Sequence, residues 1–104
     1  MQTEMKSWGA YIVLGDTAHH KISKVLLYPK ENLSFQSPED VETWILISSG
    51  VGCITSEGFV AICEGKDSVI IPKGLRYTIK NPLDESFVYI EVQQKTDLRK
   101  VLSE

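Results

Sequence analysis

The sequence predicts an all-β protein built as a barrel or a sandwich. Two observations support this fold class: apolar residues recur with a period of two along most of the chain, and clusters of turn residues separate the apolar segments. The segments are short and rich in Val, Ile, Tyr and Phe, which favour strands. Many short strands in succession are typical of barrels and sandwiches. The predicted strands cover residues 10–14, 22–28, 43–48, 52–55, 59–63, 68–71, 76–79 and 86–93.

The connections between the predicted strands and the C-terminal tail fit the same fold class. Glycine, proline and acidic residues mark turns at residues 56–58, 64–67 and 81–85. Only the C-terminal tail has a helical pattern, in which Thr96 caps the first amide groups of a short helix at residues 97–102. The 104 residues contain neither an internal repeat nor a linker, so we expect one domain that spans residues 1–104.

The composition excludes several classes of protein. An apolar fraction of 42% and a charged fraction of 24% are ordinary for a globular domain. A net charge of -3 argues against a nucleic-acid partner, which needs a dense basic surface. No apolar run approaches the ~20 residues that span a bilayer, and residues 1–6 lack the layout of a signal peptide. We therefore expect a cytoplasmic protein without a membrane partner, in which Cys53 and Cys63 are free, buried thiols.

Seven short motifs occur in order along nearly the whole chain. They are Trp8-Gly9-x-Tyr11, Lys21-x-x-Lys24, Pro29 with Leu33-Ser34-Phe35-Gln36, Glu42-x-Trp44, Ile71-Pro72-x-Gly74, Asn81-Pro82 and Ile90-Glu91-Val92-Gln93. Together they resemble the cupin domain of type II mannose-6-phosphate isomerases. In that family this domain often follows a mannose-1-phosphate guanylyltransferase domain. The resemblance implies a cupin fold, which is a double-stranded β-helix or jelly-roll barrel.

The chain departs from that family at the metal site. The resemblance implies a divalent metal held by histidines between Gln36 and Trp44 and by one histidine three residues after Gly74. The first segment of this chain contains no histidine, and Tyr77 stands in the place of the last one. Glu42 alone keeps a ligand type, and one carboxylate does not replace three imidazoles. We therefore expect neither a transition metal nor another cofactor.

A barrel without its metal still has room for a small ligand, and ligand binding is the function that we favour. We expect a sugar phosphate or a nucleotide sugar to bind without turnover. Aromatic rings offer stacking surfaces, and charged or amide groups offer hydrogen bonds to hydroxyl and phosphate groups. The predicted ligand-binding residues are Gln36, Glu42, Trp44, Arg76, Tyr77 and Glu91.

An enzymatic alternative stays open, namely a sugar-phosphate isomerase of nucleotide-sugar metabolism. Proton transfer needs a positioned acid and base, for which Glu42, Tyr77 and Glu91 are the candidates, and we assign none of them as catalytic. Glu91 alternates with Phe87 and Tyr89 on one face of its strand, while Val and Ile residues occupy the other. Either face could be the inner one.

A structural or oligomerisation module is the third possibility. If Glu42, Trp44 and Leu46 face inward, Ile45 and Ile47 face outward and leave an apolar stripe on the sheet. Another subunit usually covers such a stripe, so we expect a homodimer. On this assignment, replacing Ile47 by Lys splits the dimer and leaves the barrel folded.

Overall fold

The computed structural model describes residues 2–94 and confirms the all-β prediction. All eight predicted strands are present, and the structure adds one strand at the N-terminus and one between the second and third predicted strands. The predicted helix at residues 97–102 lies outside the described residues. The strands are β1 (Gln2–Lys6), β2 (Gly9–Asp16), β3 (His20–Leu27), β4 (Asn32–Gln36), β5 (Glu42–Ser49), β6 (Val51–Ser56), β7 (Phe59–Glu64), β8 (Ser68–Ile71), β9 (Arg76–Lys80) and β10 (Phe87–Gln94).

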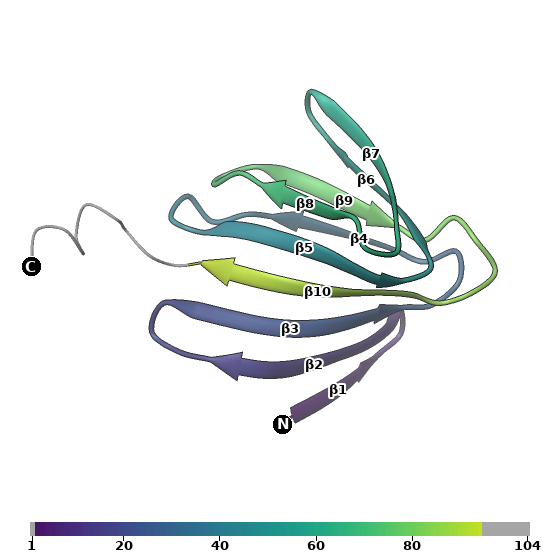
Figure 1. Cartoon of the computed structure of the whole chain (residues 1–104), viewed down its shortest axis with the longest axis horizontal. Helices are drawn as coiled ribbons and strands as arrows, with labels where there is room; N and C mark the ends of the chain where they lie inside the picture. Colours follow the sequence, from purple (N-terminus) through teal and green to yellow (C-terminus); the bar gives the residue numbers. More distant parts are fainter. Residues whose placement is uncertain (1, 95–104) are drawn as a thin grey trace, which may run out of the picture.

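The strands form two antiparallel sheets. One sheet has six strands in the order β1-β2-β3-β10-β5-β8, and the other has four in the order β4-β9-β6-β7. Figure 1 shows the larger sheet running from β1 at its lower edge through β2, β3, β10 and β5 to β8. The chain crosses repeatedly between the two sheets, as expected for a jelly roll. Within residues 2–94 no helix is long and apolar enough to cross a membrane.

The core lies between the two sheets. Residues at alternate positions of β5, β9 and β10 point into it, because successive side chains of a strand face opposite sides. The largest fully buried side chains include Leu27, Ile45, Ile54, Ile71, Ile79, Phe87 and Tyr89. Cys63 joins this core, whereas Cys53 is half-buried, and both thiols are free.

The orientation that we predicted for β5 is wrong. Ile45 is fully buried and Ile47 is 5% exposed, whereas Trp44 and Leu46 are 38% and 41% exposed. Glu42 shares the outer face with Trp44 and Leu46, since all three lie two residues apart. The alternation of β5 identifies the residues that share a face. It does not identify the inner face, because both faces of this strand are apolar.

Candidate ligand-binding site

The six predicted ligand-binding residues lie on three different surfaces. Tyr77 and Glu91 are buried between the sheets, although both are polar. The other four lie outside the barrel. The six residues therefore form three separate pairs, and of these residues only Glu91 lines the cavity between the sheets that is the candidate binding site.

Two of the outer residues share the exposed face of the four-stranded sheet. Gln36 on β4 pairs with Arg76 on β9, and Arg76 Nε donates a hydrogen bond to Gln36 Oε1 at 3.4 Å. Gln36 Nε2 donates a second bond to the Gly74 carbonyl oxygen at 2.8 Å. These contacts hold the start of β9 against the end of β4. A stabilising role in the strand pair is enough to explain both side chains.

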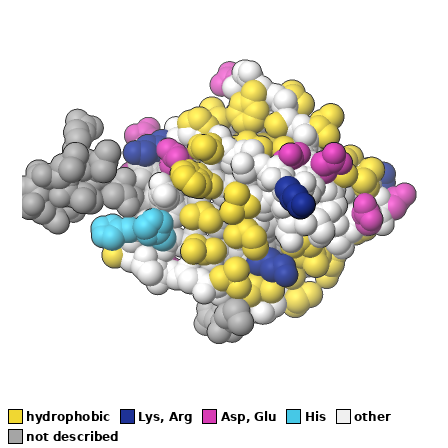
Figure 2. Space-filling model, in the orientation of Figure 1, with side chains coloured by type: hydrophobic (Ala, Val, Ile, Leu, Met, Phe, Trp, Pro, Cys, Tyr) yellow, Lys and Arg dark blue, Asp and Glu magenta, His cyan; other side chains and the backbone are white. Residues whose placement is uncertain are grey.

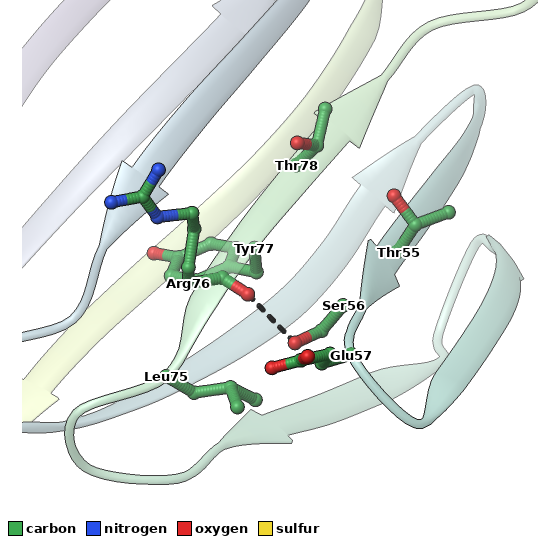
Figure 3. Close-up of a pocket in the computed structure, with 7 residues that line it drawn as sticks. All are labelled: Thr55, Ser56, Glu57, Leu75, Arg76, Tyr77 and Thr78. Atoms are coloured by element: carbon green, nitrogen blue, oxygen red, sulfur yellow. Dashed lines mark hydrogen bonds between the residues drawn. The ribbon is translucent and has the colours of Figure 1, made fainter.

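Arg76 also lines a groove of about 450 Å³ beside the turn that follows β6. Figure 3 shows it next to Tyr77 on β9, with the Ser56 hydroxyl donating a hydrogen bond of 2.7 Å to the Arg76 carbonyl oxygen. The Arg76 side chain is exposed and the Tyr77 ring is buried, because adjacent residues of a strand face opposite sides. The two side chains therefore do not face one common ligand.

A second cavity, of about 330 Å³, lies between the six-stranded sheet and β4. Its walls come from strands far apart in the sequence, which antiparallel pairing brings together. The apolar part of its lining consists of Trp8, Val25, Leu33 and Phe35. The polar part includes Tyr11, Lys21, Glu91 and Gln93. An apolar cavity with a few convergent polar groups is typical of small-molecule sites.

The polar groups of this cavity are linked to one another. Ser23 Oγ donates a hydrogen bond of 2.9 Å to the Tyr11 hydroxyl oxygen. The Lys21 ammonium lies 5.5 Å from the centre of the Tyr11 ring, and a hydrogen bond with Tyr11 is the main reason that the pKa of Lys21 is raised. Asp16 and Glu91 add smaller favourable effects on that pKa. Lys21 therefore carries a full positive charge at the cavity wall.

The charge of Glu91 also acts on two buried tyrosines, Tyr77 and Tyr89. Burial, followed by the Glu91 charge, raises the pKa of both Tyr77 and Tyr89, so each is a neutral hydroxyl at physiological pH. The Tyr89 hydroxyl is fully buried and has no hydrogen-bond partner among the described residues. A buried unpaired hydroxyl costs about 1–3 kcal/mol. A water or a ligand hydroxyl would remove that cost.

Glu91 should make the stability of the protein depend on pH. Burial raises the pKa of its carboxyl group above the ordinary 4.5, and the Lys21 charge offsets only part of this effect. The folded state therefore binds the proton more tightly than the unfolded state does. The stability that Glu91 contributes is complete below pH 4.5 and is lost as the pH rises through the raised pKa. Urea denaturation at a series of pH values measures this loss.

Glu91→Gln removes the titration and nearly preserves the shape of the side chain. Above pH 4.5, we expect the free energy of unfolding of Glu91→Gln to change less with pH than that of the wild type. At neutral pH it should exceed the wild-type value. Glu57→Gln, in an exposed turn, is the matched control and should keep the wild-type profile. Equal profiles for the wild type and Glu91→Gln would show that the carboxyl group is not desolvated.

Comparison with known proteins identifies the family of this fold. Residues 1–100 match the sequence model of the family described as mannose-6-phosphate isomerase C-terminal. The chain belongs to this family. It is 29% identical over 89 residues to a mannose-1-phosphate guanylyltransferase of Salmonella montevideo, covering 85% of this chain and 19% of that protein. The corresponding protein of Escherichia coli K12 is 25% identical over 89 residues, with 85% and 18% covered. The chain thus spans about a fifth of the length of these relatives.

Solved structures show the same fold at lower sequence identity. The cupin domain of Schizosaccharomyces pombe Cnp3 matches with a TM-score of 0.83 and 14% identity, covering 99% of this chain and 74% of that one. KdgF from a Halomonas species matches with a TM-score of 0.80 and 11% identity, covering 96% and 93%. These likenesses confirm the cupin fold of this member of the mannose-6-phosphate isomerase C-terminal family.

The residues of this family member do not fit the metal that a cupin implies. Glu42 lies on the outer face of β5, where its Oε1 accepts a hydrogen bond of 2.5 Å from Trp44 Nε1. Thr43 and Ile45 point inward instead, and Thr43 interacts with Tyr77. In the described part of the chain, no three side chains of His, Cys, Asp or Glu gather at one point. Residues 2–94 therefore offer no donor set of this kind for a transition metal.

Sequence reasoning missed the polar wall of the cavity. Lys21 and Tyr11 were noted only as parts of motifs, and Ser23 was not considered. A usable signal was present, since Lys21, Ser23 and Val25 alternate along β3. Assigning Val25 to the core would have placed the other two beside it. Trp8, from the same motif as Tyr11, also lines the cavity.

Proposed function

We propose that this chain binds a sugar phosphate in the cavity between its sheets and does not convert it. The observation that carries the proposal is the meeting of Lys21 and Glu91 with the rings of Trp8 and Phe35 around one space. An ammonium group binds phosphate as a point charge. The carboxyl group of Glu91 and the Tyr11 hydroxyl offer hydrogen bonds to sugar hydroxyls, and an aromatic ring packs on the apolar face of a sugar ring.

The size of the cavity narrows the choice of ligand. A volume of about 330 Å³ lies at the small end of the ~300–1,000 Å³ that ligand sites occupy. A hexose phosphate fits this range better than a nucleotide sugar, whose nucleoside would have to remain outside. Mannose phosphates are the first candidates, because the relatives are named for mannose 1-phosphate and the family for mannose 6-phosphate.

Lys21→Ala should weaken ligand binding by roughly 10- to 100-fold, which is the effect of losing a charge-assisted hydrogen bond of ~1.5–3 kcal/mol. Titration calorimetry with mannose 6-phosphate and mannose 1-phosphate measures the affinity, and free mannose and inorganic phosphate test each half of the ligand. Lys24→Ala is the matched control, because Lys24 lies on the same strand and points outward.

Arg76→Ala separates this cavity from the groove on the other sheet. We expect it to bind the ligand as the wild type does, since the Arg76 side chain is exposed on the outer face. Loss of binding in Arg76→Ala with normal binding in Lys21→Ala would move the site to the outer groove. A wild type that binds none of the four compounds at millimolar concentration would refute the proposal.

One observation favours an isomerase as the second candidate. Burial raises the pKa of Glu91, and a carboxyl group with a raised pKa is suited to proton transfer. An assay that detects the conversion of mannose 6-phosphate into fructose 6-phosphate decides between the two functions. Turnover that Glu91→Gln abolishes would establish the enzyme, whereas binding without turnover supports the binding module.

We also infer that the protein works in the cytoplasm. The support is chemical: the thiols of Cys53 and Cys63 are free, and free thiols persist in a reducing compartment. Intact cells can be denatured directly in the presence of a thiol reagent. The extent of labelling then reports whether Cys53 and Cys63 are reduced in the cell.

A further inference from the structure

The outer faces of the two sheets differ in their side chains. Figure 2 shows hydrophobic side chains gathered over β5, β10 and β3, on the outer face of the six-stranded sheet. The outer face of the four-stranded sheet is mainly polar on β4, β9 and β6. Its outward residues include Asn32, Ser34, Gln36, Cys53, Thr55, Arg76, Thr78 and Lys80. These side chains include two cations and no carboxylate, so a protein with a net charge of -3 presents positive charge here.

The strand register arranges these residues in rows across the sheet. Thr78 on β9 lies between Ser34 of β4 and Thr55 of β6, so short hydroxyl side chains form the middle row. Arg76 lies in the row on one side and Lys80 in the row on the other, because alternate residues of β9 share this face. The two cations are four residues apart on an extended strand, hence ~13 Å apart along the backbone. A floor of small hydroxyl groups separates two positive charges.

Each cation lines a hollow of the surface. Arg76 lines the groove of about 450 Å³ together with Thr55 and Thr78. Lys80 lines another groove, of about 310 Å³, together with its cross-strand neighbour Cys53. The two grooves adjoin, since Thr78 in the first and Lys80 in the second are two residues apart on the same face of β9. An elongated ligand that lies along β9 can therefore occupy both grooves.

Both cations keep hydrogen-bond donors for a ligand. Arg76 uses only Nε in its bond to Gln36, so within residues 2–94 its four Nη–H donors have no partner. Figure 3 shows its guanidinium group turned away from Glu57, a carboxylate that lines the same groove. The Lys80 ammonium forms no ion pair with any residue of the described part of the chain. Guanidinium and ammonium groups with open donors bind carboxylate and phosphate groups well.

Two carboxylates lie near the ends of the paired grooves. Glu57, in the turn after β6, lines the groove of Arg76. Glu31, in the turn before β4, lines the groove of Lys80, where Lys30 adds a further positive charge. Like charges repel, so these carboxylates disfavour acidic groups beyond the two cations. The acidic groups of a ligand are thereby directed to the stretch between Arg76 and Lys80.

The chemistry of the face favours a carbohydrate over a peptide or a nucleic acid. Sugar hydroxyls both donate and accept hydrogen bonds, as the Ser and Thr hydroxyls of the middle row do. β9 and β6 each pair with a strand on both sides, so their backbone groups are not open to an added peptide strand. The outward residues named above include no aromatic ring, on which the bases of a single-stranded nucleic acid would stack.

We propose that the outer face of the four-stranded sheet binds a linear acidic oligosaccharide, with one acidic group at Arg76 and a second at Lys80. The site is independent of the sugar-phosphate cavity, because that cavity is lined by Leu33 and Phe35, which lie on the opposite face of β4. A ligand long enough to reach both cations gains from the second contact without a second loss of translational freedom.

Hyaluronan oligosaccharides test the proposal, because they carry one carboxylate on every second sugar. We expect the tetrasaccharide, with two carboxylates, to bind at least ~10-fold more tightly than the disaccharide, with one. Binding should weaken as salt is added, and neutral chitotetraose should not bind at millimolar concentration. Titrations followed by amide resonances give the affinities and should shift the signals of β9 and β6. A chondroitin sulfate tetrasaccharide extends the test to sulfated chains.

Arg76→Ala and Lys80→Ala should each weaken tetrasaccharide binding by ~3- to 5-fold, as expected for an exposed ion pair. The double variant should lose ~10- to 25-fold, because effects at sites this far apart add. Lys24→Ala, which removes an exposed cation from the other sheet, is the matched control and should bind as the wild type does. Lys21→Ala should also bind the tetrasaccharide normally, which separates this site from the cavity.

Circular dichroism must show that each variant keeps the wild-type strand signal. Additive losses in the two β9 variants, with normal binding in both controls, support the proposal. A wild type that binds neither acidic tetrasaccharide at millimolar concentration overturns it. It is also overturned if chitotetraose binds as tightly as hyaluronan, or if Lys21→Ala loses binding that the double variant retains.

Discussion

Replacing Ile47 by Lys is expected to unfold the protein. The side chain of Ile47 is 5% exposed and belongs to the core between the sheets, and its backbone N–H donates to the Asp67 carbonyl oxygen. A lysine ammonium at this position loses its water and gains no partner. The cost of an unpaired buried charge, about 4 kcal/mol or more, is comparable with a whole stability of ~5–15 kcal/mol. Circular dichroism and urea denaturation should show a lost or strongly shifted transition.

Two neighbouring substitutions serve as controls. Leu46→Lys places the same charge one residue away on the outer face and should leave the barrel folded. Ile62→Lys changes an exposed residue of β7 and should have little effect on stability. A folded Ile47→Lys together with an unfolded Leu46→Lys would mean that β5 presents the other face to the core.

The reversal of β5 shows what strand alternation leaves undecided. A period of two sorts the residues of a strand into two sets, and the apolar set is normally the inner one. In β5 both sets are apolar, with Ile45 and Ile47 on one side and Trp44 and Leu46 on the other. The outer set is apolar because Trp44 and Leu46 lie among other exposed apolar side chains of the sheet, such as Ile70, which pairs with Trp44.

Two strands escaped prediction for a related reason. β1 and β4 are edge strands of their sheets, so they contribute fewer residues to the core than central strands do. The sequence of β1 is mainly polar, and Lys6 and Glu4 form an ion pair there at 3.0 Å. β4 has only five residues, of which Leu33 and Phe35 alone are apolar and face inward. The apolar alternation of each strand is too short to identify the strand from the sequence alone.

The candidate site was only partly visible in the sequence. Tyr77 and Glu91 were identified because the cupin resemblance places their strands at the barrel interior, and both are buried there. Lys21 and Tyr11 line the cavity together with Glu91, from two other strands, and Tyr77 is not part of its lining. Pairing of β10 with β3 places Glu91 opposite Ser23, two residues along the strand from Lys21. Such proximity depends on strand order, which local patterns do not determine.

The motifs that carry the family resemblance belong mostly to the fold. At Gly9 the backbone φ is 155°, and an added Cβ atom would lie 1.8 Å from the Leu26 carbonyl oxygen. Gly74 has a φ of 73°, which favours glycine at the turn before β9. Residues of this kind preserve the barrel whatever chemistry it holds. A chain that keeps such residues can match the family over residues 1–100 whichever side chains line its interior.

Asn81→Ala tests this structural role and is expected to lower the free energy of unfolding by about 3 kcal/mol. Asn81 is fully buried, and its Nδ2 donates to the carbonyl oxygens of Leu27, Tyr28 and Glu85 at 3.0, 3.1 and 2.7 Å. Its Oδ1 accepts a bond of 3.1 Å from the backbone N–H of Leu83. One amide thus ties the end of β3 to the loop before β10, and alanine leaves these buried groups without their partner.

Asn32→Ala, at an exposed position of β4, is the matched control and should change the stability by less than about 0.5 kcal/mol. Urea denaturation of both variants gives the comparison, and ligand titration adds a second readout. Because Asn81 lies outside the lining of the Lys21 cavity, folded Asn81→Ala should bind the ligand with wild-type affinity. An Asn81→Ala protein as stable as the wild type, but unable to bind, would instead make this motif residue part of the binding site.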